Sequence, residues 1–164
     1  MAAQLPCART LANIERVARR PIQPISIGRL QAWADEARLD PGNATGWRQA
    51  QAEWLRAEIP VRLAQRICDF NLLPYFALRN AHFQSVYQLY VKSFEDIYAA
   101  PPCATVAHEE EFYQLLKRLV EGHADVIKQL QQGHLELRTR GWILPDDGAA
   151  LEPREVGGMV LGIG

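Results

Sequence analysis

The sequence lacks several features that would assign it to a common class of protein. No apolar run approaches the roughly 20 residues that a membrane-spanning helix needs. No stretch alternates like a β-strand, and no segment repeats. No glycine-rich loop carries the lysine and the serine or threonine that cradle phosphates. These absences predict a soluble chain with no transmembrane segment and no nucleotide site of its own.

The sequence also has almost no net charge and no pattern of paired cysteines. The 18 Lys and Arg against 19 Asp and Glu give a net charge of −1, with both signs interleaved, so we expect no nucleic-acid partner. The cysteines, Cys7, Cys68 and Cys103, are odd in number and in no metal-ligand pattern, and the four histidines do not complete one. We therefore expect free thiols in a reducing compartment, and neither a metal nor a cofactor bound to this chain.

Acidic residues are nearly absent from the first 24 residues. Glu15 is the single acid among four arginines, Arg9, Arg16, Arg19 and Arg20. An arginine-rich, acid-poor start is typical of a mitochondrial transit segment, and an ordinary basic arm has the same composition. Both interpretations of residues 1–20 stay open.

The apolar residues of the sequence form four helical patterns in succession. Apolar spacing and the positions of capping residues, proline and glycine predict helices over about 26–38, 47–70, 80–99 and 106–138. Pro60 lies inside the second pattern and lacks a backbone donor, so we expect a kink or break near Ile59. Gly122 and Gly133 are weak points of the fourth. Residues 141–164 hold six of the eleven glycines and no period, which predicts an irregular tail.

One histidine occupies a position where the fourth pattern would normally carry an apolar residue. The seam steps by four and three residues through Phe112, Leu116, Leu119, His123, Val126 and Leu130. His123 has three interpretations: a core histidine bonded to a neighbour, the phosphoacceptor of a histidine phosphotransfer bundle, or a histidine in a ligand pocket or polar network. Asp125 nearby favours the phosphoacceptor. A phosphoacceptor must however be accessible to its partner, and the neutral residue and proline that should follow the histidine and acid are absent.

Several motifs, in order, carry a resemblance to a known family. "WLRAEIPVRLAQRICDFNLLP" (Trp54 to Pro74) resembles a signature of the mitochondrial kinases that phosphorylate pyruvate dehydrogenase and branched-chain α-ketoacid dehydrogenase. The match extends to "PISIGRLQAWA" (Pro24 to Ala34), "LYVKSFEDI" (Leu89 to Ile97) and "FYQLLKRLVEGHADVIKQLQQG" (Phe112 to Gly133). The resemblance covers about residues 20–138.

The resemblance implies an all-α fold. Residues 21–140 would be the family's regulatory domain, an incomplete antiparallel four-helix bundle with a short first helix and without its last helix. The family continues into an ATP-binding domain of the GHKL type, which uses ATP and magnesium and which this sequence lacks. Residues 141–164 match nothing in the family, so we expect a non-native tail from a truncated gene model, a read-through intron or a fragment. The unpaired seams would cause dimerisation or aggregation.

The resemblance also implies a function. The family's members are matrix serine/threonine kinases that phosphorylate the E1 subunit of a dehydrogenase complex, inhibit it, and dock on its lipoyl domain. Pyruvate and branched-chain substrates both stay open. We expect this chain alone to be inactive as an enzyme. The alternative is a non-catalytic module that binds lipoyl domains or interferes with a full-length kinase.

Six residues match functional positions of the family. His123 matches a histidine that supports catalysis beside the general base and borders an allosteric ligand pocket, and Asp125 matches the aspartate of the same motif. Four apolar residues match positions that receive the lipoyl group: Ile25, Leu30, Trp33 and Trp54. Plain core packing remains an equally good interpretation of each of these four.

Overall fold

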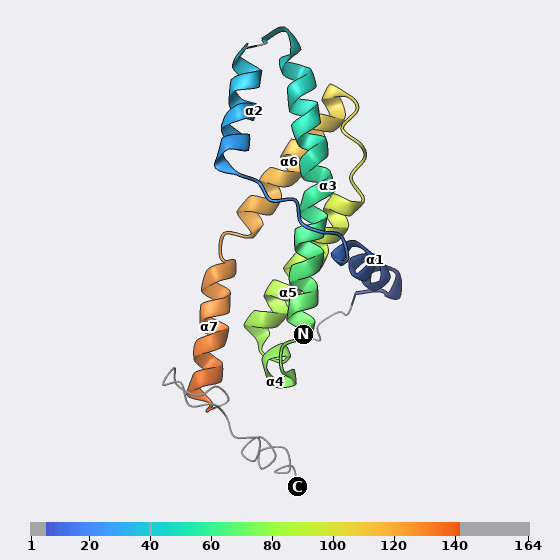
Figure 1. Cartoon of the computed structure of the whole chain (residues 1–164). Coiled ribbons are helices and arrows are strands. Elements are labelled where there is room, and N and C mark those ends of the chain that lie inside the picture. The colour runs from blue at the N-terminus through green and yellow to red at the C-terminus, as the bar shows by residue number, and fades with distance from the viewer. Residues whose placement is uncertain (1–5, 40, 142–164) are drawn as a thin grey trace.

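The computed structural model describes residues 6–39 and 41–141, and the regular structure of these residues is entirely helical (Figure 1). The elements are α1 (Ala8–Ala18), α2 (Ile27–Leu39), the 3₁₀ turn η1 (Pro41–Asn43), α3 (Ala44–Asn71), α4 (Tyr75–Leu78), α5 (Ala81–Tyr98), α6 (Val106–Gly122) and α7 (Val126–Thr139). The all-α prediction is confirmed. The predicted irregular tail lies outside the described residues, apart from Gly141.

Polar side chains define where three of the helices begin. Asn80 Oδ1 accepts hydrogen bonds of 2.9 and 3.3 Å from two amides of the first turn of α5. Thr105 Oγ1 accepts one of 3.2 Å in α6, and Ser26 Oγ accepts one of 3.2 Å in α2. These bonds satisfy amides that have no partner within the helix. The predicted starts of α2, α5 and α6 are therefore confirmed.

Helix α3 continues through Pro60. The predicted break near Ile59 is wrong, because the helix runs unbroken for 28 residues. A proline in a helix interior removes one backbone hydrogen bond. That cost is offset by the face of α3 that carries Val61, Ala64 and Ile67, all fully buried in the core.

The predicted helix over 106–138 is wrong at its centre. Helix α6 ends at Gly122 and α7 starts at Val126, so His123 lies in the turn between two helices. Glycine is a poor helix former, and the His123 ring bonds back to the carbonyl of Leu119, which ends α6 in a local cap. Gly133, the other predicted weak point, lies inside α7 without interrupting it.

Helix α1 was not predicted. It falls within residues 1–20, which the sequence suggested as a transit segment or a basic arm. Ile14 and Val17 of α1 are 1% and 3% exposed and pack with residues of α3 and α5. Thr10 Oγ1 donates a 2.5 Å hydrogen bond to Glu95 of α5. Residues 8–18 are therefore part of the folded core.

The long helices pack around α3 and α5, which lie side by side and run in opposite directions (Figure 1). Helix α2 lies beside the first half of α3, α6 crosses the pair, and α7 packs on α5. Phe94, Phe70 and Phe112 each belong to a different cluster of the core. The antiparallel four-helix arrangement as a whole stays a prediction.

Within residues 6–39 and 41–141, no helix is both long enough and apolar enough to cross a bilayer.

Candidate functional site

Two tryptophans that are distant in sequence meet where α2 lies against α3. The rings of Trp33 and Trp54 are 5.3 Å apart between centroids and cross at 71°, an edge-to-face pair. The Arg29 guanidinium lies 5.3 Å from the Trp33 ring and 5.6 Å from the Trp54 ring. Ile25 and Leu30, 36% and 48% exposed, belong to the same stretch of chain. We call these five residues the tryptophan patch.

The segment that leads into α2 is bonded to α3 beside this patch. We call residues 19–26 the strap. Trp54 Nε1 donates a 3.1 Å hydrogen bond to the side-chain oxygen of Gln23. The backbone amide of Gln23 donates a 3.0 Å bond to Glu58, whose side chain is 5% exposed. The orientation of the Trp54 ring is thus coupled to the strap.

His123 lies in a different part of the molecule. Its ring stacks on Tyr90, with centroids 5.6 Å apart and planes 14° apart. Its Nδ1 is 2.6 Å from the Leu119 carbonyl oxygen, and since that oxygen can only accept, Nδ1 carries the proton. Nε2 is buried and has no hydrogen-bond partner among the described residues. Asp125 is exposed in the turn before α7.

This geometry favours the core interpretation of His123 over a phosphoacceptor. A phosphoacceptor needs a ring nitrogen that a partner's phosphoryl group can reach. One nitrogen of His123 is engaged by a carbonyl and the other is buried.

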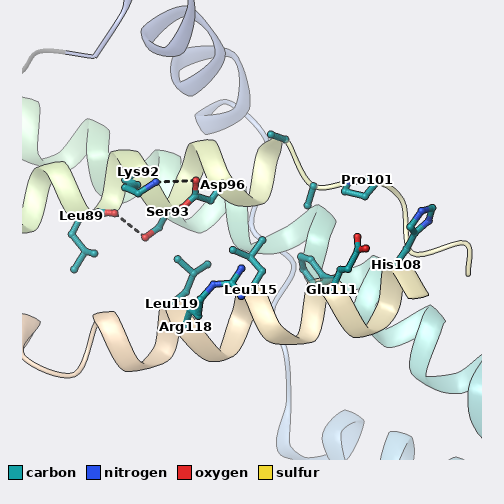
Figure 2. A pocket seen from close by; sticks show the side chains of 13 residues that line it. Leu89, Lys92, Ser93, Asp96, Pro101, His108, Glu111, Leu115, Arg118 and Leu119 are labelled. Carbon is teal, nitrogen blue, oxygen red and sulfur yellow. Dashed lines mark hydrogen bonds and ion pairs between the residues drawn. The ribbon is translucent and has the colours of Figure 1, made fainter. Parts of the chain in front are cut away.

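A cavity of about 570 Å³ opens between α5 and α6 (Figure 2). Figure 2 shows Arg118 and Leu119 projecting from α6 toward α5, where Lys92 pairs with Asp96 at 3.2 Å. Arg118 forms no ion pair with any described residue. His123 is not among the residues that line the cavity, although Leu119, to which it bonds, is. Apolar walls with a few polar groups are a general feature of small-molecule sites.

Titratable groups with perturbed pKa values lie outside the tryptophan patch. Hydrogen bonds from Arg56, and a weaker one from the amide of Cys103, hold the pKa of Glu53 below its ordinary value of 4.5. Burial raises the pKa of the Cys68 and Cys103 thiols. The part of the chain that the structure describes contains no group of three His, Cys, Asp or Glu that could hold a metal ion.

The structure brings together some of the residues singled out in the sequence and separates others. Trp33 and Trp54 are in contact, while His123 stacks on Tyr90 of α5, which packs against two clusters of the core. Sequence reasoning missed Arg29, Gln23 and Glu58. Two of them had a signal: Arg29 precedes Trp33 by four residues, and Glu58 follows Trp54 by four, so each shares a helix face with its tryptophan.

Together the fold and the patch define an all-α domain that carries an aromatic pair on the first half of its longest helix. The chain belongs to the mitochondrial branched-chain α-ketoacid dehydrogenase kinase family, whose model matches residues 37–149. Trp54, His123 and Asp125 fall within the matched segment, and Trp33 precedes it. The resemblance read from the sequence motifs is therefore confirmed.

Curated relatives of the chain are named mitochondrial pyruvate dehydrogenase (acetyl-transferring) kinases. Isozyme 3 from Homo sapiens is 29% identical over 132 residues, which cover 78% of this chain and 30% of the relative. The kinase from Drosophila melanogaster is 34% identical over 87 residues, 52% of this chain and 21% of the relative. The kinase from Arabidopsis thaliana is 29% identical over 87 residues, which cover 53% of this chain and 24% of the relative. The chain spans about a quarter of the length of the curated relatives it matches.

Proposed function

We propose that this chain is the regulatory and docking domain of a mitochondrial serine/threonine kinase, and that the tryptophan patch binds the lipoyl group of an α-ketoacid dehydrogenase complex. The observation that carries the proposal is the contact of Trp33 with Trp54, together with the exposure of Ile25 and Leu30 on the same stretch of chain as Trp33. A lipoyl arm is an apolar chain, and burying it would contribute about 0.8 kcal/mol per CH₂ group. Aromatic residues at a partly exposed site are also the ones most often dominant in binding.

The activity proposed for the whole kinase follows from the family. Its members would phosphorylate the E1 subunit of the complex in the matrix and inhibit it, with ATP and magnesium as cofactors. The family model names a branched-chain substrate and the relatives name pyruvate dehydrogenase, so the proposal leaves the choice between these two substrates open. We place ATP binding and phosphoryl transfer in the part of the relatives that this chain does not match, and expect no turnover from this chain.

Within the kinase we propose a supporting role in catalysis for His123 and Asp125. The buried, unpartnered Nε2 of His123 supports this role, because an unsatisfied ring nitrogen could bond to a group from another part of a longer kinase. Asp125 is the N-cap residue of α7, and its role in the same proposal comes from the family motif that it matches. A non-catalytic module that binds lipoyl domains is the second candidate, and the same patch supports it.

Calorimetric titration of the chain with a lipoylated domain tests the docking proposal. We expect the wild-type chain to bind, and Trp33→Ala and Trp54→Ala to bind at least about tenfold more weakly. Tyr75→Ala is the matched control, because Tyr75 is an exposed aromatic residue on α4, and it should bind like the wild type. No binding by a folded wild-type chain, or equal affinity in all three variants, would refute the proposal.

An ATPase and kinase assay separates the two candidates. A chain that only docks should show no nucleotide turnover, with or without the lipoylated domain. Measurable turnover by this chain would contradict our placement of the phosphoryl-transfer machinery.

A further inference from the structure

One face of α3 is hydrogen-bonded to the strap, at Arg20 and Gln23, and to Ala18 at the end of α1. Four residues on this face, spaced by four, four and three positions, are Trp54, Glu58, Arg62 and Gln65. Such spacing keeps side chains on one side of a helix, here over about 16 Å at 1.5 Å per residue. Each of the four forms a hydrogen bond to residues 18–23.

Three of the four α3 residues on this face bond to the same strap residue, Gln23. Glu58 Oε1 accepts the Gln23 amide at 3.0 Å and Arg62 Nε at 3.2 Å. The Arg62 guanidinium also donates to the Gln23 carbonyl at 2.9 Å. Both backbone groups of Gln23 are thus bonded, and its side chain accepts from Trp54 Nε1 at 3.1 Å. Gln65, the last of the four, does not contact Gln23 and instead donates to the carbonyls of Ala18 and Arg20.

Packing alone does not account for a carboxylate at position 58. Glu58 is 4% exposed, and burying an ionised carboxylate is costly unless it is paired and hydrogen-bonded. An apolar side chain would bury at lower cost, but it could not accept the amide of Gln23. What the carboxylate adds is therefore a fixed position for Gln23.

That position has a consequence for the tryptophan patch. Three residues after Gln23, Ser26 caps α2, and α2 then places Arg29 and Trp33 over Trp54. Gln23 therefore constrains the patch twice, once through its side chain on Trp54 and once through the start of α2.

We propose that Glu58 is a positioning residue of the tryptophan patch: by holding Gln23 on α3 it sets the edge-to-face contact of Trp33 with Trp54. The predicted effect on lipoyl binding rests on the proposed docking function, but the effect on the patch itself does not.

Glu58→Ala and Glu58→Gln, made in the full chain, form the test. We expect Glu58→Ala to raise amide hydrogen exchange in residues 19–39 about tenfold or more, to change the near-ultraviolet circular dichroism of the tryptophans, and to weaken lipoylated-domain binding about tenfold. Glu58→Gln keeps an oxygen that can accept the Gln23 amide, so it should restore all three readouts to within about threefold of the wild type. Gln65→Ala is the control on the same face, and should leave the dichroism and the affinity unchanged.

A merely structural role would give a different result. It would raise exchange equally in α5 and α7, and the Gln variant would rescue none of the readouts; either outcome overturns the proposal. If Glu58→Ala does not fold, Glu58→Asp replaces it, because the shorter side chain withdraws the carboxylate from the Gln23 amide and must still alter the dichroism. If the wild-type chain does not bind the lipoylated domain, the docking function fails, while exchange and dichroism still decide the role of Glu58.

Discussion

At the scale of single residues, His123 makes contacts of two kinds and leaves one group unsatisfied. Its ring stacks on Tyr90, and its Nδ1 donates to the Leu119 carbonyl at the end of α6. Nε2 is buried without a partner, which costs free energy in the isolated chain. The ring is therefore held by its face and by one edge only.

Replacing His123 separates the contribution of the ring from that of its nitrogens. His123→Ala should lower the free energy of unfolding by about 1–2 kcal/mol, because the stack on Tyr90 is lost. His123→Phe keeps a ring but loses the bond to Leu119, and removal of the unsatisfied nitrogen offsets that loss, so we expect a change within about 0.5 kcal/mol. Urea denaturation measures both, with the exposed His134→Ala as control. Equal losses in the Ala and Phe variants would show that the nitrogens matter more than the stack.

The Glu53 carboxylate couples stability to pH. Arg56 and the Cys103 amide lower its pKa in the folded chain, so its stabilising effect is complete above the ordinary value of 4.5 and is lost as the pH falls through the folded value. Glu53→Gln should therefore lower the urea midpoint at neutral pH, and the difference from the wild type should shrink in acid. The effect is modest, because the side chain is 43% exposed. A difference for Glu53→Gln that grows in acid would contradict the assignment.

At the scale of elements, α7 approaches α5 closely at one glycine. A Cβ atom added at Gly133 would lie 3.0 Å from Asn80 Oδ1 and 3.0 Å from the Phe83 ring. Asn80 also caps α5 and donates to Glu136 of α7 at 2.8 Å. Glycine at this position therefore lets α7 reach the cap of α5.

Two glycine substitutions test this close approach. Alanine favours helix over glycine by about 1 kcal/mol, but overpacking costs about 1–3 kcal/mol, so Gly133→Ala should destabilise the chain. At Gly122 the nearest atom, in Leu89, would be 4.0 Å away, so Gly122→Ala should be neutral or stabilising. Thermal melts of both variants provide the measurement. A stabilised Gly133→Ala variant would mean that α7 does not lie this close to α5 in solution.

The elements also show how far sequence alone could reach. The cores of α3 and α5 follow from apolar spacing, since Ile67 and Phe94 lie within the helices that this spacing predicts over about 47–70 and 80–99, and both are buried. The break at His123 could not be predicted, because the seam keeps its spacing across it and the interruption depends on a side chain bonding to its own helix. Helix α1 was missed because its two buried apolar residues, Ile14 and Val17, lie among arginines that dominate the composition.

The candidate site was predictable to a similar extent. Trp33 and Trp54 could be selected from the motifs that contain them, but their contact requires α2 to lie on α3, and the strap decides this. Gln23 had no signal of its own, because its role depends on the Glu58 carboxylate 35 residues away.

At the scale of the whole molecule, α6 and α7 carry large apolar side chains that remain exposed. Tyr113 and Val120 are two turns apart on α6 and are 56% and 73% exposed. Ile127 and Leu135 lie eight residues apart on α7 and are 71% and 63% exposed. Large apolar side chains that stay exposed on two consecutive helices favour association when they can be buried against another copy.

We predict that the chain self-associates through this apolar surface. Sedimentation velocity should detect dimers or larger species in the wild type, and Val120→Glu combined with Ile127→Glu should shift the population toward monomer. Leu72→Glu, at a residue 84% exposed outside this surface, is the control and should leave the distribution unchanged. A monodisperse wild-type monomer with a cooperative melt would contradict the prediction.

The most direct test of the central claim is a hydrogen-exchange footprint of a lipoyl domain on the full chain. With the lipoylated domain, we predict slower exchange in residues 19–39 and 51–58, which include the strap and the tryptophan patch. The same domain without its lipoyl group should leave exchange in these residues unchanged. Protection confined to α6 and α7, or identical protection by both forms of the domain, would contradict the claim that the tryptophan patch binds the lipoyl group.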